Sequence, residues 1–312
     1  MKTDGESKSI ACVTGGSGLV GRRIVRQLQR EGYIVRILTR KIGDPSTGHF
    51  HGDINNETEM KLFLSGAKLV FHCAAEINDP SIMWKVNVQG TQRLWDLLRE
   101  TGVEFFCYVS SAGVIGRTRE KNVDENTPCH PETVYEQSKW AAEQIVRRGI
   151  PGRRVAILRP TNVVDEQQPG ALALPIRRDW PARLKTFLKG GECAHIVHSE
   201  DVAAAAMHLI SRSLEEPTCF FVSCDHEALN TYAGLWSLYK AIAGHQPTEG
   251  IHPAPHLPLF IPYLLRKIVR GTGNHGDVRY SSGRLLSTGF RFPLGLEGAI
   301  RSIASSPRTI AP

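Results

Sequence analysis

The sequence predicts an α/β fold, a doubly wound parallel sheet with a smaller and mainly helical C-terminal lobe. Short β-branched runs alternate with longer amphipathic segments through about the first two-thirds of the 312 residues, which is typical of βαβ units. Hydrophobic residues make up 41% and charged residues 22% of the chain, which excludes disordered and disulfide-stapled classes. A chain of this length is enough for about two domains.

The expected elements follow one another in regular order up to Asn162. Strands are expected at residues 10–13, 35–39, 69–73, 105–110, 155–158 and 219–223. Helices are expected at residues 18–31, 57–64, 82–100, 132–148 and 200–211. Gly32 and Gly102 follow the first and third helices, where glycine commonly ends a helix. Because the alternation then stops, we expect one α/β domain over 1–164, to which 192–230 returns, and a lobe built from 165–191 and 231–312.

A glycine-rich turn joins the first strand to the first helix. Residues 14–21 read T-G-G-S-G-L-V-G, and a segment with helical periodicity follows. A helix N-terminus at such a turn offers free N–H groups to a pyrophosphate, and glycine lets the phosphates approach the backbone. The alternative is an ordinary βα turn, but the flanking elements favour a Rossmann-type dinucleotide site. Its expected cofactor-binding residues are Thr14, Gly15, Gly18, Leu19, Val20 and Gly21.

The end of the second strand indicates which dinucleotide binds. An NAD site usually places Asp or Glu there, whereas this strand ends in Arg40 and Lys41, with no carboxylate before Asp44. Two cations suit the 2′-phosphate of NADP, because guanidinium binds phosphate oxygens bidentately. Arg22 or Arg23 could join them. The alternative is that these are solvated loop charges; the pattern favours NADP(H) over NAD(H).

A tyrosine and a lysine share one face of the fourth expected helix. Tyr135 and Lys139 are four residues apart, so their side chains can act together. A nearby ammonium is expected to lower the phenol pKa, so that tyrosine can exchange a proton with a carbonyl or hydroxyl oxygen. Ser110 and Ser111 end the preceding strand. The spacing alone is a weak signal, and its specificity comes from the motifs around it.

Further motifs lie in a fixed order along the chain. They read G-D-I at 52–54, H-C-A-A at 72–75, N-V-Q-G-T at 87–91, S-S-A-G-V at 110–114, Y-E-Q-S-K-W-A-A-E at 135–143, L-R-P-T-N-V-V at 158–164 and H-S-E-D-V-A at 198–203. With these motifs the chain resembles the extended short-chain dehydrogenase/reductase family, of the NAD-dependent epimerase/dehydratase type. The resemblance covers nearly the whole chain. That family includes sugar-nucleotide epimerases, dehydratases, 3β-hydroxysteroid dehydrogenases and dihydroflavonol-type reductases.

The resemblance implies a role for each member of the set. Tyr135 is the general acid/base, Lys139 depresses its pKa and binds the nicotinamide ribose, and Ser111 hydrogen-bonds the reacting oxygen. Asp53 contacts adenine, while Asn87 has a structural role. The other implied cofactor-binding positions are Ile54, Ala74, Ala75 and Pro160, and the implied substrate-binding positions are Glu76, Ala112, Asn162 and Asp277.

The histidines are expected to be structural. His72 and His198 lie at family positions where packing and backbone hydrogen bonds explain them. The others show no H-E-x-x-H or Cys/His ligand spacing, so no metal site is expected.

Departures from the family narrow the expected function. Residues 164–166 read V-D-E where many sugar-nucleotide members have Tyr-Gly-Pro, and the segment that holds the substrate pyrophosphate is compressed to 189–197. We therefore expect an NADP(H)-dependent carbonyl reductase or secondary-alcohol dehydrogenase. The alternative is an NAD-dependent sugar-nucleotide 4-epimerase, which the G-D-V at 276–278 favours. A third hypothesis is a non-catalytic cofactor sensor, against which the intact Ser111, Tyr135 and Lys139 argue.

The positive charge is concentrated near the C-terminus. The net charge is +7, and from residue 251 onward eight Lys or Arg face two acidic residues. We expect a small-molecule substrate and no nucleic acid, because the rest of the chain is nearly neutral. If Arg266, Arg279 or Arg284 lines the substrate site, the substrate is anionic, such as a nucleotide-linked keto-sugar. Relatives often form dimers, so a homodimer is one expected arrangement.

Two observations concern membranes and compartment. Residues 257–270 join an apolar run to basic residues, as in segments that lie in a membrane interface, but two prolines interrupt the run. We favour a packed helix of the lobe over membrane contact. The seven scattered cysteines, the lack of a secretory signal and of a spanning run predict a cytoplasmic protein with reduced thiols.

Overall fold

The computed structural model describes residues 9–40, 45–177, 179–264 and 276–305. It confirms the expected α/β fold, and it divides into two compact units. Unit 1 comprises Met1–Val114, Pro131–Arg159 and Ala203–Phe220, and unit 2 comprises Ile115–His130, Pro160–Val202 and Phe221–Pro312. The chain thus enters each unit more than once.

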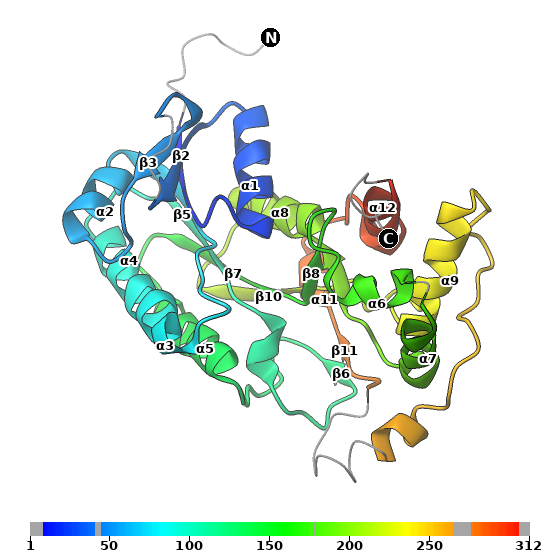
Figure 1. Cartoon of the computed structure of the whole chain (residues 1–312). Helices are drawn as coiled ribbons and strands as arrows, with labels where there is room; N and C mark the ends of the chain where they lie inside the picture. Colours follow the sequence, from blue (N-terminus) through cyan, green and yellow to red (C-terminus); the bar gives the residue numbers. More distant parts are fainter. Residues whose placement is uncertain (1–8, 41–44, 178, 265–275, 306–312) are drawn as a thin grey trace. The chain divides into compact units, whose positions relative to one another are not determined.

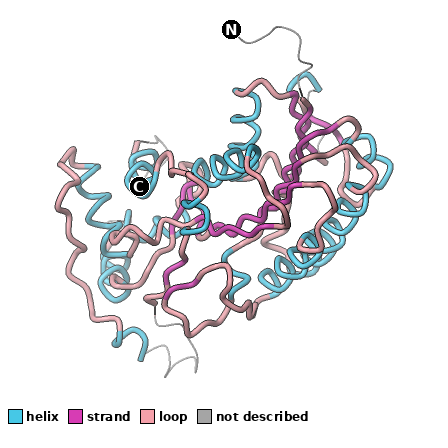
Figure 2. Tube along the Cα trace, turned by 180° about the vertical axis from the view of Figure 1, so that it is seen from behind, coloured by secondary structure: helices cyan, strands magenta, loops and turns pink. Residues whose placement is uncertain are grey.

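Unit 1 is built on a seven-stranded sheet (Figures 1 and 2). The strand order is β10-β7-β5-β4-β1-β2-β3, and the strands from β7 to β3 pair in parallel. The strands are β1 Ile10–Thr14, β2 Ile34–Thr39, β3 His49–His51, β4 Ala67–His72, β5 Phe105–Val109, β7 Arg154–Pro160 and β10 Thr218–Val222. The order reverses beside β1, whose neighbours are β2 and β4, and a sheet of this kind binds its ligand at that point.

Helices cover both faces of this sheet. Figure 1 shows α1 (Leu19–Arg30) on the opposite side from α4 (Gly90–Leu98) and α5 (Val134–Val146). The core beneath α2 (Glu57–Leu64), α4 and α5 includes Trp95 packed edge-on against Phe106, with ring centroids 5.3 Å apart. Both side chains are buried, so this face is sealed by large apolar groups.

The helix expected over 82–100 consists of three pieces. It begins as α3 (Pro80–Met83), continues as a π-helical segment, Trp84–Gln89, and ends as α4. A π-helical segment inside a helix is rare and is often found at functional sites. The hydrophobic period could not show it, because one extra residue in a turn hardly changes the pattern over two turns.

Unit 2 contains two small sheets and several helices. β8 (Asn162–Val164) pairs with β9 (Ile196–His198), and β6 (Asn122–Val123) pairs with β11 (Arg279–Tyr280). The longer helices are α7 Trp180–Lys189, α9 Tyr232–Ala243 and α12 Gly295–Ala304, and the shorter ones are α6 Ala173–Ile176 and α11 Gly283–Ser287. α8 (Ser199–His208) has residues in both units. The core of unit 2 lies among α9, α12 and the β8–β9 pair.

Two features bear on the environment of the chain. All seven cysteines fall in the described ranges as free thiols. None of the helices within those ranges is long and apolar enough to cross a bilayer.

Candidate active site

The start of α5 positions Tyr135. The Thr133 hydroxyl accepts a hydrogen bond from the Glu136 N–H, and the Glu136 carboxylate accepts one from the Thr133 N–H. This reciprocal capping box satisfies two N–H groups that a helix start leaves free. The cap fixes the first turn of α5, which carries Tyr135, and Lys139 follows one turn later.

Ser111 and Tyr135 lie side by side in unit 1. Their side chains are hydrogen-bonded to each other, and the Ser111 hydroxyl also accepts the Gly113 N–H at 3.1 Å. Burial raises the pKa of Tyr135 above its ordinary value, and the bond from Ser111 opposes this rise. Two hydroxyls that exchange a hydrogen bond can both reach one oxygen of a bound molecule.

The Lys139 side chain is buried, one helical turn after Tyr135 on α5. Its Nζ donates a hydrogen bond to the Val109 carbonyl at 2.7 Å and lies 4.3 Å from the centre of the Tyr108 ring. Burial lowers the pKa of Lys139 to about 7. The structure therefore differs from the expectation that Lys139 depresses the Tyr135 pKa, because burial dominates at Tyr135 and Lys139 is not among the groups that shift it.

A buried ion pair supports the site from below. The Glu143 carboxylate accepts hydrogen bonds from Ser110 Oγ at 2.7 Å, Arg159 Nη2 at 2.7 Å and Arg147 Nε at 2.8 Å. Burial raises the Glu143 pKa, but the contacts with Arg159, Arg147 and Ser110 outweigh it, so that the pKa is lowered. The pair links α5 to the ends of β5 and β7.

Asn87 ties the π-helical segment to the catalytic helix. Its Oδ1 accepts the Glu76 N–H at 2.7 Å, and its Nδ2 donates to the Glu76 carbonyl at 3.0 Å and to Ser138 Oγ at 2.9 Å. These bonds give Asn87 the structural role expected from the sequence. The Glu76 carboxylate accepts the N–H groups of the three residues that follow it, so it shapes its own loop.

The glycine turn forms a cradle against the start of the loop after β4. Gly15 has a φ of +68°, and a Cβ there would come 2.6 Å from the Ala74 nitrogen. A Cβ on Gly21 would come 2.2 Å from the Gly15 carbonyl oxygen. Only glycine fits at both positions. The Thr14 hydroxyl accepts the Ala74 N–H at 3.3 Å and is hydrogen-bonded to His72 Nδ1 at 2.6 Å, which gives this histidine a structural role.

The remaining predicted cofactor residues are less tightly grouped. Arg40 is exposed after β2, and Lys41 lies outside the described residues. One carboxylate oxygen of Asp53 accepts the Asn55 N–H at 2.8 Å, while Ile54 is buried in the core. Leu19 and Val20 open α1, Ala75 follows Ala74, and Pro160 ends β7.

Several predicted substrate residues make contacts within their own unit. Asn162 Nδ2 donates to the Ala194 carbonyl at 2.7 Å, and Asp277 pairs with Lys121 at 3.0 Å. Arg279 Nη1 donates to the Asp225 carbonyl, and Arg284 lies 3.5 Å from Glu125.

Ala112 is buried, and Arg266 lies outside the described residues. Of the three arginines proposed to attract an anion, Arg279 and Arg284 thus have partners within the folded chain.

One polar pair was missed by the sequence reasoning. His195 Nδ1 lies 2.7 Å from the Asp225 carboxylate in unit 2, and the His195 carbonyl accepts the Asn162 N–H. His195 has a φ of +55°, a strained conformation for a residue with a side chain. The two residues are 30 positions apart, so only the fold brings them together.

The comparison with protein families decides the affiliation. A family model described as the NAD dependent epimerase/dehydratase family matches residues 11–220. The chain belongs to this family. This is the extended short-chain dehydrogenase/reductase type that the sequence motifs predicted. The glycine turn fits the NAD that the family description names, because its close backbone packing leads directly into the start of α1, where no side chain caps the free N–H groups that can hold a pyrophosphate.

Members of this family with different activities are similar to the chain. The mouse sterol-4-alpha-carboxylate 3-dehydrogenase, decarboxylating, is 27% identical over 84% of this chain and 75% of that protein. Sterol demethylase protein B from Methylococcus capsulatus is 25% identical over 89% and 88%. An undecaprenol-linked N-acetylglucosaminyl 4-epimerase of Escherichia coli is 31% identical over 50% and 49%. The match to an uncharacterized Sinorhizobium fredii protein, 32% identical, spans 63% of this chain and about half, 52%, of that one.

Solved structures in this family share the fold. A short-chain dehydrogenase/reductase superfamily protein from Agrobacterium tumefaciens with bound NAD superposes with a TM-score of 0.74 at 21% identity, covering 96% of this chain and 97% of that one. The UDP-glucose 4-epimerase of Thermotoga maritima gives 0.69 at 21% identity, covering 96% and 98%. At these identities the likeness concerns the fold.

Proposed function

We propose that the protein is an NADP(H)-dependent oxidoreductase that interconverts a carbonyl group and a secondary alcohol. The observation that carries the proposal is the hydrogen-bonded pair Ser111 and Tyr135, with the buried Lys139 one turn after Tyr135 on α5. Hydroxyls placed in this way can hold one substrate oxygen and exchange a proton with it. The dinucleotide would lie in the glycine cradle and, when bound, would donate or accept a hydride.

Each residue has a distinct task in this mechanism. The Ser111 hydroxyl orients the substrate oxygen, and the Tyr135 hydroxyl gives it a proton when a carbonyl is reduced. Burial raises the pKa of Tyr135, so the neutral phenol predominates near neutral pH and is ready to donate. Oxidation of an alcohol needs the phenolate instead. We therefore expect the oxidation rate to keep rising with pH well above neutrality, while reduction falls.

The proposed preference for NADP(H) rests on the end of β2. Arg40 is exposed there, and guanidinium pairs well with a 2′-phosphate. Titration with NADPH and NADH tests this preference directly. Arg40→Gln should weaken NADPH binding about tenfold, within the range of a charge-assisted contact, and leave NADH binding unchanged. Equal affinity for the two cofactors in the wild-type protein contradicts the preference.

The extent of the alignments supports net redox chemistry. The two relatives named for sterols align over 84% and 89% of the chain, whereas the undecaprenol-linked 4-epimerase aligns over 50%. The two sterol-named proteins therefore align with more of the chain than this epimerase does. A substrate panel should include hydroxysteroids, ketosteroids, smaller ketones and nucleotide-linked keto-sugars, with oxidation of NADPH followed by absorbance. Turnover of a keto-sugar alone would support the anionic substrate expected from the charge distribution.

A sugar-nucleotide 4-epimerase is the second candidate. One carboxylate oxygen of Asp277, Oδ1, is buried without a hydrogen-bond partner among the described residues, and a ligand hydroxyl could supply one. Protein that is purified with bound NAD⁺ and interconverts UDP-hexoses without added cofactor would favour this candidate over the oxidoreductase.

Tyr135→Phe tests both candidates at once, because each needs the phenol. Turnover should fall by at least about a hundredfold, since general acid catalysis contributes that much, while cofactor affinity stays within twofold. Ser287→Ala changes a hydroxyl on exposed α11, where it donates to the Arg284 carbonyl, and serves as the control. Full turnover by Tyr135→Phe refutes the assignment.

A further inference from the structure

Helix α7 turns its large apolar side chains outward. Trp180, Leu184 and Phe187 recur at helical spacing on one stripe and are exposed, Trp180 by 72%. The buried positions of α7 are instead Ala182 and Thr186. An ordinary surface helix has the opposite arrangement, with its large apolar residues packed against the core. The packing of unit 2 therefore does not explain why these large apolar side chains are exposed.

A second apolar segment extends the stripe. The Leu257 N–H donates to the Phe187 carbonyl at 3.1 Å, which joins residues 257–264 to α7. Phe260, 67% exposed, and Leu264 are four residues apart in the helical turn that follows. The sequence had favoured inward packing of this run, whereas Phe260 and Leu264 are exposed. We call Trp180, Leu184, Phe187, Phe260 and Leu264 the α7 patch.

The concentration of these residues is unusual. Eleven large hydrophobic residues are exposed in the described ranges, and five of them form the α7 patch. Large apolar side chains exposed on two hydrogen-bonded segments are typical of a surface that meets a protein or a membrane.

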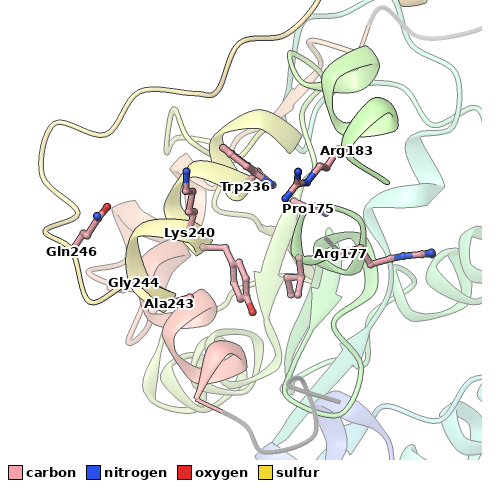
Figure 3. Close-up of a pocket in the computed structure, with 10 residues that line it drawn as sticks. Pro175, Arg177, Arg183, Trp236, Lys240, Ala243, Gly244 and Gln246 are labelled. Atoms are coloured by element: carbon pink, nitrogen blue, oxygen red, sulfur yellow. The ribbon is translucent and has the colours of Figure 1, made fainter. Parts of the chain in front are cut away.

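Cations lie along α7 beside its apolar stripe, and the acidic residue at the N-cap, Asp179, is paired with Arg177. Helix α7 carries Arg183, Lys185 and Lys189 and no acidic residue. Arg183 also lines a pocket of about 420 Å³ together with Arg177 and Lys240 (Figure 3). None of the ten residues lining this pocket is Asp or Glu. An apolar surface with cations beside it is complementary to anionic headgroups that cover an apolar interior.

We propose that the α7 patch docks on the surface of an anionic phospholipid bilayer. The apolar side chains enter the headgroup region, and the cations of α7 and of the neighbouring pocket meet lipid phosphates. A tryptophan at the start of α7 suits this depth, since its ring prefers the interface. Attachment is interfacial, in keeping with the absence of any bilayer-crossing helix from the described ranges.

A second copy of the chain fits the patch less well. A two-fold contact puts the same surface on both subunits, so two α7 helices would meet, each with three cations along it and a single acidic residue, the N-cap Asp179, that already pairs with Arg177. Like charges brought together in this way repel each other. The charge pattern thus favours lipid over self-association.

Co-sedimentation of the full chain with vesicles tests the proposal. Vesicles of phosphatidylcholine alone are compared with vesicles that also contain phosphatidylglycerol, and binding should be strong only to the second kind and weaken with salt. The double variant Trp180→Ser/Phe260→Ser should lose about tenfold or more in partitioning. Arg183→Gln/Lys185→Gln should lose about tenfold on anionic vesicles and little on neutral ones.

A matched control separates the patch from exposed apolar surface in general. Leu62 on α2 is 60% exposed and lies in unit 1, so Leu62→Ser should bind vesicles as the wild type does. Circular dichroism and thermal unfolding establish that each variant is folded. The proposal is overturned if the wild type stays in the supernatant with both vesicles, or if Leu62→Ser loses as much binding. It is equally overturned if sedimentation velocity reveals a dimer that the Trp180→Ser/Phe260→Ser variant cannot form.

Discussion

Replacement of Glu143 by glutamine should destabilise the protein severely. Glu143 is 0% exposed and Arg159 is 1% exposed, and the two form a bidentate pair. Glu143→Gln leaves the guanidinium of Arg159 buried without a counter-charge. Removing one partner of a buried pair costs about 3–5 kcal/mol. Glutamine keeps one oxygen that can accept a hydrogen bond, so we expect the lower end, about 3 kcal/mol.

Urea unfolding measures this loss, and a double-mutant cycle identifies its source. Arg159→Met alone leaves the Glu143 carboxylate buried and uncompensated, and should be comparably costly. The double variant Glu143→Gln/Arg159→Met should lose about 1–3 kcal/mol less than the sum of the two single changes, because it strands no charge. Cofactor affinity and turnover should fall in step with stability, since Glu143 also holds Ser110.

An exposed pair supplies the control. Glu297 and Arg301 are four residues apart on α12 with side chains about half exposed, and their atoms approach to 2.5 Å. Glu297→Gln should cost less than about 0.5 kcal/mol, because water and salt screen such a pair. The reasoning is refuted if Glu143→Gln unfolds within about 1 kcal/mol of the wild type, or if the two buried changes are additive.

Three further predictions concern the turn and two buried ionisable groups. Gly21→Ala should abolish dinucleotide binding in a titration, because the added Cβ would come 2.2 Å from a backbone oxygen. Gly102→Ala is the control and should bind the dinucleotide normally, because no atom lies within 4 Å of the position of its Cβ. Burial raises the Asp201 pKa to about 7, so the folded state holds a proton that the unfolded state releases at lower pH. Stability relative to Asp201→Asn should therefore fall as pH rises from about 4 to about 7 in denaturation curves, and a constant difference contradicts this. Burial lowers the Lys139 pKa to about 7, so the wild type must bury a charged ammonium below that pH. Lys139→Met should therefore be inactive yet more stable than the wild type below pH 7, and this difference in stability should shrink toward pH 10. Greater stability of the wild type at pH 6 contradicts this prediction.

The sequence predicted the sheet well because each long strand is a buried β-branched or aromatic run. β5, Phe105–Val109, is buried at every position and was expected at 105–110. β3, His49–His51, was missed because it is short and polar at both ends, and only pairing with β2 makes it a strand. The π-helical segment was missed for a related reason, since Asn87 is held by bonds to Glu76 and Ser138 that lie far away in sequence.

The sequence predicted which residues form the candidate site, but it did not predict the electrostatics of that site. Spacing placed Tyr135 and Lys139 on one helix face and the motif order added Ser111. The sequence could not show that the Lys139 ammonium binds the Val109 carbonyl, nor that burial, and not this ammonium, dominates the pKa of the Tyr135 phenol. The pairing of His195 with Asp225 was equally invisible, because neither residue belongs to a recognisable spacing.

The order of segments in unit 1 has a consequence for synthesis on the ribosome. β10 forms the edge of the sheet beside β7, yet it comes from residues 218–222, after a long excursion of the chain through unit 2. Roughly sixty residues separate the two strands, which a ribosome adds in several seconds at about 5–20 residues per second. For that time the nascent chain presents the apolar edge of β7 without its neighbour. Recruitment of a chaperone at this stage would protect the edge from pairing with another chain.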